Sequence, residues 1–474
     1  MNRKQTLIAA LLAATLYPLA SHAAGEAKYV LFFLGDGMGP VTTTAARIWK
    51  YKEEGSLNMD TLPYTARVKT YSLDAQTTDS APSMAAYMTG VKTRNEVLSM
   101  DADTVAFRPS ASAAPLPVVS NAVSNCPASG NGIPSTTLLE LAIAKGKATG
   151  VVSTARLSHA TPAATYAHSC HRDAEYEIAR QAVPGGAGFN GALGSGVDVL
   201  MGGISTYWRP YNAGTTPRGR PDGRDLVAEL QARGYGFASD LASMNAAPAV
   251  AGSKLIGLYD FALAQGHMSY ELDRDPTREP SLAQMTMKSI DILSKNANGF
   301  FLMVEGGRID HALHGTNAAR ALADTIAFDD AIKAALDKVK VFDPTLANTL
   351  IVVTADHDHT MAFNGYGKRG ADPLGLNLNY VNGAPNTDAN GNSYTTLVFG
   401  NGANRPAVRG STAAAAVIDK DYLQEVAIRR GGPGSETHGG GDVMLFAGGA
   451  ASKTFKGTID NTKVFGLVKA AAGY

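Results

Sequence analysis

Three short, largely apolar runs, each followed closely by a carboxylate, constrain the fold of this chain most. The runs cover residues 29–34, 300–304 and 348–355. The carboxylates that follow them are Asp36, Glu305 and Asp356. Runs of this length and composition are typical of strands that are buried on both faces. Because ligands of open α/β sheets bind outside the carboxyl ends of the strands, these side chains are predicted to meet at one site.

Between these runs, helical and strand-like patterns alternate along most of the chain. Helices are indicated over 135–145, 281–295 and 318–338, and a further strand over 150–154. This order predicts an α/β fold, a three-layer α/β/α sandwich around a large and mostly parallel central sheet. The range 365–433 breaks the pattern because it is rich in Gly, Asn and Pro. We expect it to form a surface insertion within the domain.

The first 23 residues are typical of an export signal. Arg3 and Lys4 precede an apolar stretch over 7–20, and Ser21-His22-Ala23 matches a small-x-small cleavage site. We therefore expect one catalytic domain over 24–474 and a periplasmic or secreted protein. An uncleaved membrane anchor is the alternative, although the apolar stretch is short for a membrane span.

Charge and cysteine content restrict the partners and the compartment. The chain has 42 basic and 42 acidic side chains, which argues against nucleic acid or an anionic membrane as the main partner. Its two cysteines are Cys126 and Cys170. In an oxidising compartment they can pair, and two free buried cysteines are the alternative.

Histidines accompany the carboxylates at two of the predicted strand ends. Asp310 and His314 follow Glu305 and, four residues apart, would share one face of a helical turn. His357 and His359 follow Asp356. Such donors suit zinc and magnesium. One of these aspartates alone would be interpreted as a turn or helix-cap residue, but the whole set indicates a metal centre.

The range 77–90 has the pattern of a helix that begins near Ser80. Pro82 suits the first turn, and Gly90 suits the end of the helix. Ser80 would then lie where backbone N–H groups are unpaired, which is a ready anion site. An ordinary helix cap formed by Asp79 and Ser80 is the alternative.

Together these segments resemble the alkaline phosphatase family. Motifs similar in type and order to those of the family occupy 35–39, 79–81, 305–314, 356–359 and 436–438. The resemblance covers essentially all of the mature chain. It implies hydrolysis of phosphate monoesters at alkaline pH through a covalent phosphoserine, with release of inorganic phosphate. It also implies two zinc ions, a third metal, and a homodimer, which is the usual state of family members.

Matching motif to motif carries roles to positions of this chain. Asp310, His314 and His438 resemble the ligands of one zinc. Asp36, Asp356, His357 and the oxygen of Ser80 resemble those of the second zinc. Asp36, Thr161 and Glu305 resemble the magnesium ligands. Arg172 resembles the phosphate-binding arginine, although without the motif it would be interpreted as a surface residue.

Two histidines lie where the family varies. His159 and His311 occupy positions that also hold aspartate and lysine in relatives, so the third metal is magnesium or zinc, which histidine favours. The alternative for His159 is a polar helper without metal contact. We expect His359 to support the zinc held by Asp356 and His357.

Calcium is not expected, although animal members of the family carry a structural calcium ion. Tyr259, Asp260 and Glu279 resemble part of that site, but no matching carboxylate is evident over 205–218.

Other functions remain as alternatives to a phosphomonoesterase. A phosphodiesterase or sulfatase of a sister family would share the metal ligands, but the combination of Ser80 with Arg172 argues against it. A metal-stabilised exported binding protein without turnover is the remaining alternative, and a missing ligand or nucleophile would favour it.

Overall fold

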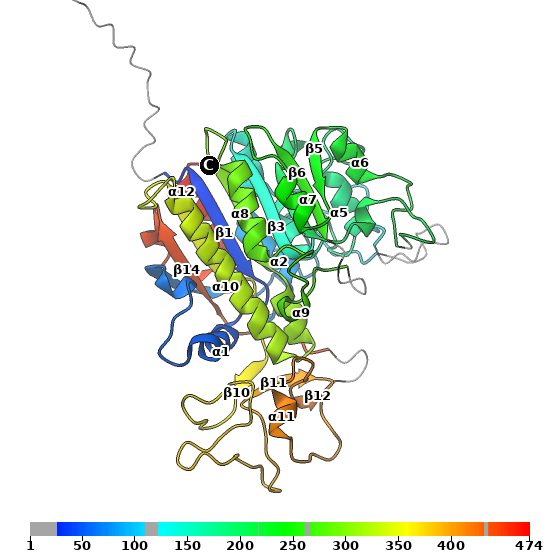
Figure 1. Ribbon diagram of the computed structural model, residues 1–474. Helices are drawn as coiled ribbons and strands as arrows, with labels where there is room; N and C mark the ends of the chain where they lie inside the picture. The colour runs from blue at the N-terminus through cyan, green and yellow to red at the C-terminus, as the bar shows by residue number, and fades with distance from the viewer. Residues whose placement is uncertain (1–25, 110–121, 217, 260, 262–265, 431–434) are drawn as a thin grey trace, which may run out of the picture.

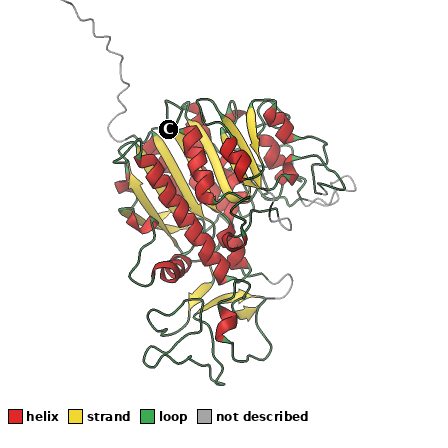
Figure 2. Cartoon of the chain, in the orientation of Figure 1, coloured by secondary structure: helices red, strands yellow, loops and turns green. Residues whose placement is uncertain are grey.

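The computed structural model describes residues 26–109, 122–216, 218–259, 261, 266–430 and 435–474, so the expected export signal lies outside it. A ten-stranded sheet forms the centre, with helices on both faces (Figure 1, Figure 2). Its strands, in spatial order, are β15 (Gly457–Asp460), β2 (Tyr64–Lys69), β14 (Val443–Gly449), β8 (Thr349–Ala355), β1 (Tyr29–Gly35), β7 (Phe300–Gly306), β3 (Ala148–Arg156), β4 (Val199–Gly203), β6 (Lys254–Tyr259) and β5 (Tyr235–Ala238). Among these ten strands only β14 runs antiparallel to its neighbours. The predicted three-layer fold with a mostly parallel sheet is confirmed.

The three apolar runs become the neighbouring central strands β8, β1 and β7. Every residue of β7 and β8 is buried, which is why their sequences show no alternation of polar and apolar residues. The register pairs Gly35 with both Gly306 and Ala355. Asp36, Glu305 and Asp356 therefore emerge at one edge of the sheet, as predicted.

Helices cover the sheet in two layers. One layer contains α1 (Pro40–Tyr51), α8 (Leu282–Leu293), α9 (Arg308–His314) and α10 (Ala318–Lys340). The other contains α2 (Ser80–Thr89), α3 (Leu138–Ala144), α4 (Ala160–Tyr166) and α12 (Asn461–Ala472). Shorter helices are α5 (Glu175–Gln181), α6 (Leu226–Gln231), α7 (Leu241–Ala246) and α11 (Ala414–Val417). The helix expected from residue 135 begins at 138, because Thr137 and Glu140 form a capping box there.

The described residues 365–430, which we expect to form a surface insertion, lie beyond the sheet and next to α9 (Figure 1). A three-stranded sheet lies there, formed by β10 (Met361–Phe363), which precedes the expected range, together with β11 (Leu397–Gly402) and β12 (Val426–Arg429). A separate pair of short strands, β9 (Asp358–His359) and β13 (His438–Gly439), brings the two ends of this part of the chain together beside the central sheet. Within the described residues, no helix is both long and apolar enough to cross a membrane.

Candidate metal centre and active site

A fully buried cluster of two carboxylates and one imidazole lies at the ends of β1 and β8. His357 Nε2 is 3.4 Å from Asp36 Oδ1 and 3.3 Å from Asp356 Oδ2. Asp356 Oδ1 accepts the N–H groups of Gly37 and His357, whereas Oδ2 has no hydrogen-bond partner. Burial raises the pKa of Asp36 well above its usual range and that of Asp356 to about 7. A cation between these oxygens would remove the cost of burying two like charges.

A second buried group shares Asp36. Thr161, on α4, places Oγ1 3.4 Å from Asp36 Oδ2. Glu305, on β7, accepts a hydrogen bond from Ser153 through Oε2, but Oε1 is buried without a partner. Burial raises the pKa of Glu305 to about 8. His159 Nδ1 is likewise unpartnered, and His159, Asp36 and Glu305 are close enough to hold one ion.

Histidines dominate the third cluster, which adjoins α9. Asp310 and His314 lie on one face of α9, with His314 Nε2 3.3 Å from Asp310 Oδ1. His314 Nδ1 donates to the carbonyl of Glu436, and His438 Nδ1 donates to that of Thr78. Each neutral ring therefore presents a lone pair at Nε2. These two Nε2 atoms are 3.1 Å apart, and a cation is the partner that two facing lone pairs require.

His359 supports this third cluster. Its Nε2 is 2.8 Å from Asp310 Oδ1, and its Nδ1 is 2.5 Å from Glu436 Oε2. Burial alone would lower its pKa, but the contacts with Glu436 and Asp310 raise it to about 10. We expected His359 to support Asp356 and His357. The structure instead places it against Asp310, because β9 pairs with β13 and turns the side chain toward α9.

Ser80 is the first residue of α2, and its hydroxyl faces the buried cluster. Asp79 is the helix cap and accepts the N–H of Ala81 at 2.7 Å. This arrangement leaves Ser80 Oγ 3.1 Å from His357 Nε2 and 3.4 Å from Asp36 Oδ1. Residues 79 and 80 were interpreted either as a helix cap or as an anion site. Asp79 caps the helix, and Ser80 faces the candidate metal ligands.

Arg172 lies beside Ser80 rather than on the open surface. Its guanidinium is 3.0 Å from Asp79 Oδ1 and 3.0 Å from His159 Nε2, and its side chain is only 15% exposed. Asp79 and Glu96 outweigh the effect of burial and raise the pKa of Arg172 above its usual value. A permanently charged, planar cation is therefore fixed next to the serine.

His311 and His159 lie in a group of three histidine rings. The centroid of the His311 ring is 4.0 Å from that of His267 and 5.3 Å from that of His159. Arg308 contacts His311 Nδ1 at 3.2 Å. Burial lowers the pKa of all three histidines, so they are neutral. His267 was not predicted, since no motif surrounds it.

Two carboxylates outside the predicted ligand set orient site residues. Asp79 holds Arg172, and Glu436 holds both His359 and Thr360. Both lie one or two residues from a predicted site residue, and that proximity was the available signal.

Two residues that resemble part of a calcium site are Glu279 and Asp260. Glu279 is buried, accepts the N–H of Ser269 and leaves Oε2 unpartnered, while Asp260 lies outside the described residues.

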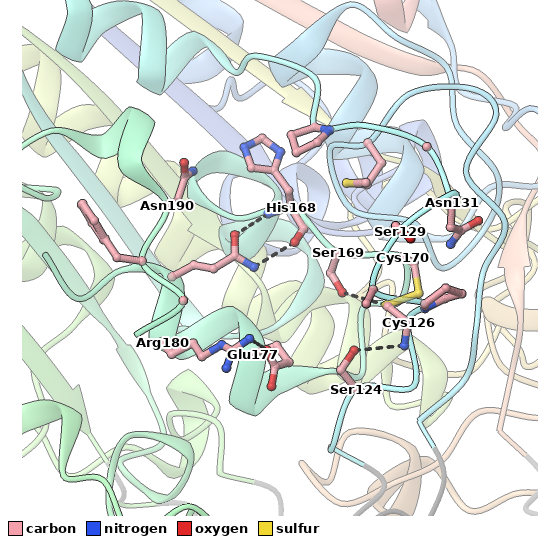
Figure 3. A pocket seen from close by; sticks show the side chains of 18 of the residues that line it. Ser124, Cys126, Ser129, Asn131, His168, Ser169, Cys170, Glu177, Arg180 and Asn190 are labelled. Atoms are coloured by element: carbon pink, nitrogen blue, oxygen red, sulfur yellow. Dashed lines mark hydrogen bonds and ion pairs between the residues drawn. A yellow bond between two sulfur atoms is a disulfide. The ribbon is translucent and has the colours of Figure 1, made fainter. Parts of the chain in front are cut away.

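A disulfide joins Cys126 to Cys170, two residues from Arg172, which decides between the two alternatives for these cysteines (Figure 3). Beside it lies a cavity of about 540 Å³. None of the predicted site residues lines this cavity. Gln181 binds the backbone of His168, and Asn190 binds Glu140, so these polar groups are satisfied within the wall. The cavity is therefore not the active site.

Three adjoining groups of metal donors, a serine at a helix N-terminus and a fixed arginine define a metal-dependent hydrolase that acts on an anionic substrate. The alkaline phosphatase family model matches residues 27–474. The chain belongs to the alkaline phosphatase family.

Relatives agree with this assignment, and solved structures share the fold. The alkaline phosphatase of Gadus morhua is 35% identical over 91% of this chain and 89% of its own. The tissue-nonspecific isozyme of Gallus gallus is 35% identical over 91% of this chain and 82% of its own. Among solved structures, the Thermus thermophilus enzyme has a TM-score of 0.66 at 23% identity, covering 97% of this chain and 96% of its own. The enzyme of the Antarctic bacterium TAB5 has a TM-score of 0.62 at 23% identity, covering 94% and 99%.

Proposed function

We propose that this enzyme hydrolyses phosphate monoesters through a phosphoserine at Ser80. The observation that carries the proposal is the position of Ser80 Oγ, which faces Asp36 and His357 at the N-terminus of a ten-residue helix, beside Arg172. A helix N-terminus and a guanidinium both favour a phosphate dianion. No predicted ligand or nucleophile lies away from the site, so a non-catalytic binding protein is disfavoured.

Each residue has a defined task in the proposed reaction. Ser80 Oγ loses its proton to water and attacks phosphorus. The bond from phosphorus to the leaving oxygen breaks, and that oxygen takes up a proton from water to leave as the alcohol. Arg172 binds two non-bridging oxygens with its planar fork, and Asp79 holds that fork in place. Water then attacks the phosphoserine, which releases inorganic phosphate and restores Ser80.

The unpartnered buried oxygens and the facing imidazole lone pairs fit the expected metals. One zinc would be held by Asp310, His314 and His438, a second by Asp36, Asp356 and His357, and a third ion by Asp36, Thr161 and Glu305. When bound, these cations supply positive charge that stabilises the serine oxygen and the leaving oxygen.

We propose that the third site accepts zinc as well as magnesium, because His159 lies within ligand distance of Asp36 and Glu305 and its Nδ1 has no hydrogen-bond partner. A TAB5 alkaline phosphatase variant in which a histidine is replaced by aspartate was solved with magnesium in its M3 site. His159→Asp should accordingly shift the third site of this enzyme toward magnesium. Elemental analysis after equilibration with both ions measures that shift.

The decisive experiment traps the covalent intermediate. Enzyme incubated with inorganic phosphate at mildly acidic pH is quenched in acid and mapped by peptide mass spectrometry. Phosphate on the peptide that contains Ser80, absent from Ser80→Ala, supports the proposal. Full activity in Ser80→Ala, or inversion at a chiral phosphorus, would show direct attack by water instead.

Substrate class, location and assembly are proposed on the same basis. Chromogenic phosphate monoesters should be cleaved far faster than the matching diester or sulfate ester, and the reverse order would favour a sister family.

The disulfide fits an exported protein, periplasmic or secreted. A homodimer is expected, and light scattering of the purified protein tests it.

A further inference from the structure

Asp358 separates two site histidines, and its carboxylate accepts from the backbone of one of them rather than from an imidazole ring. Its backbone pairs with Gly439, and its carbonyl lies 3.2 Å from His357 Nδ1. Asp358 Oδ1 accepts the N–H of His359 at 2.8 Å. The carboxylate itself lies against two glycines from distant parts of the chain, Gly39 and Gly441.

Space beside this carboxylate, and not backbone conformation, favours glycine at both positions. A Cβ added at Gly39 would lie 1.6 Å from Asp358 Oδ1, and one added at Gly441 would lie 2.4 Å from Oδ2. Gly39 has φ −71°, which any residue adopts. Among the described residues with positive φ, Gly441 is absent. The contact is therefore a matter of space, and the three residues interlock.

Gly39 also begins a helix that has no side-chain cap. It precedes the 12-residue α1, whose N-terminus carries no capping hydrogen bond from a side chain. A carboxylate at this end of the helix is attracted to the positive pole of the helix dipole. The Asp358 side chain thus meets a favourable partner, which gives the interlock an attractive component as well as a steric one.

We propose that Asp358 is a positioning residue that clamps together three loops bearing metal ligands. Gly39 follows Asp36 by three residues, Gly441 follows His438 by three residues, and Asp358 itself follows His357. One carboxylate therefore fixes the relative positions of ligands from two of the proposed zinc sites. The inference rests on the proposed metal assignment, since holding ligands within a fraction of an ångström preserves metal affinity.

The test measures release of zinc from the metal-loaded enzyme into an excess of chromophoric chelator. Asp358→Ala should release zinc at least about tenfold faster, the size of effect typical of groups that orient ligands. Asp358→Asn keeps the shape and the acceptor for His359 N–H, so its release should stay within about threefold of the parent. Asp442→Ala is the matched control, because Asp442 adjoins Gly441 but pairs with the exposed Arg67.

A double-mutant cycle then tests the interlock itself. Gly39→Ala should speed zinc release and lower the unfolding midpoint in the parent. Both effects should be clearly smaller in the Asp358→Ala background, where the colliding carboxylate is gone and only the Cβ of residue 358, 3.0 Å from the added Cβ, remains. Parent-like zinc release in Asp358→Ala, or equal effects of Gly39→Ala in both backgrounds, overturns the clamp. If the parent binds no zinc, the proposed function fails, and the unfolding midpoints of the four proteins still decide on the interlock.

Discussion

The two candidate zinc clusters are built on opposite principles. Asp36, Asp356 and His357 are all fully buried, and two of the three are carboxylates. Asp310, His314 and His438 include only one carboxylate, and the side chain of His314 is 31% exposed. The inner cluster is therefore dry and rich in negative charge, whereas the outer cluster is accessible and rich in imidazole.

The difference shows how each cluster is prepared for a cation. In the inner cluster, burial raises the pKa of Asp36 and Asp356, which shows how costly two buried charges are there without a cation. In the outer cluster burial is outweighed by histidines, which lower the pKa of Asp310. There, fixed acceptors on each Nδ1 set the ring tautomers in advance. Cation binding at the inner cluster therefore depends mainly on the charge of its carboxylates, and at the outer cluster on the orientation of its imidazole rings.

The largest effect should come from breaking the inner cluster at Asp36, which two metal groups share. Asp36→Ala should lower kcat/KM by roughly 10⁴-fold or more, whereas His314→Ala should lower it by roughly 10²–10³-fold. Steady-state assays with a chromogenic phosphomonoester, together with metal analysis, measure both. Equal losses in the two variants would contradict the shared role of Asp36.

Removing the Arg172 guanidinium while keeping both metal clusters should have a smaller effect on activity. Arg172→Ala should lower kcat/KM by about 1.5–3 kcal/mol of transition-state binding and weaken inhibition by phosphate. The zinc content of the two zinc clusters should equal that of the parent, because Arg172 contacts Asp79 and His159 rather than a ligand of either cluster. Arg180→Ala, on α5, is the control. Unchanged phosphate inhibition would reject the assignment of Arg172.

Metal removal should separate the clusters in time. Because His314 and His438 are partly exposed and the inner ligands are not, the outer ion should leave first. A chelator should produce two phases of zinc loss whose rates differ by about tenfold, with activity lost in the faster phase. Zinc measured against remaining activity gives the order, and a single phase would remove the distinction between the clusters.

Local sequence pattern was enough for the elements that carry the ligands. Buried runs predicted β1, β7 and β8 to within two residues, and their parallel register follows from the α/β order. The four-residue spacing of Asp310 and His314 placed them on one face of α9. Thr161 and Arg172 were predicted as site residues only from the family motifs, because no local sequence pattern distinguishes them from other threonines and arginines.

Contacts between distant segments could not be predicted in this way. His359 supports Asp310 because β9 pairs with β13, and no feature near His359 indicates that pairing. His267 reaches His311 from a loop after β6 that carries no motif. The contact of Asp358 with Gly39 joins segments more than 300 residues apart. Only the folded arrangement reveals which groups orient the ligands.

The smallest effect on catalysis is expected from Asp324, a buried carboxylate on α10 that belongs to neither cluster. Burial raises its pKa to about 7, above the usual value near 3.8, although Arg308 opposes the shift. The folded protein therefore binds more protons here than the unfolded chain between about pH 4 and 7, and this group costs stability as pH rises through that range. Asp324→Asn resembles the protonated form and escapes the cost.

Between pH 5 and pH 8 the parent should accordingly lose about 2–3 kcal/mol of unfolding free energy relative to Asp324→Asn, with kcat/KM nearly equal in the two proteins. Denaturant unfolding of the metal-loaded enzymes at several pH values measures the difference. Parallel pH profiles would show that Asp324 stays ionised, and burial alone would then not explain the raised pKa values of the inner cluster. A widening gap would show that burial is the main cause of a raised carboxylate pKa in this fold, with Glu271 and Asp273 adding less. The close approach of Asp36 to Asp356 would then be the feature particular to the inner site.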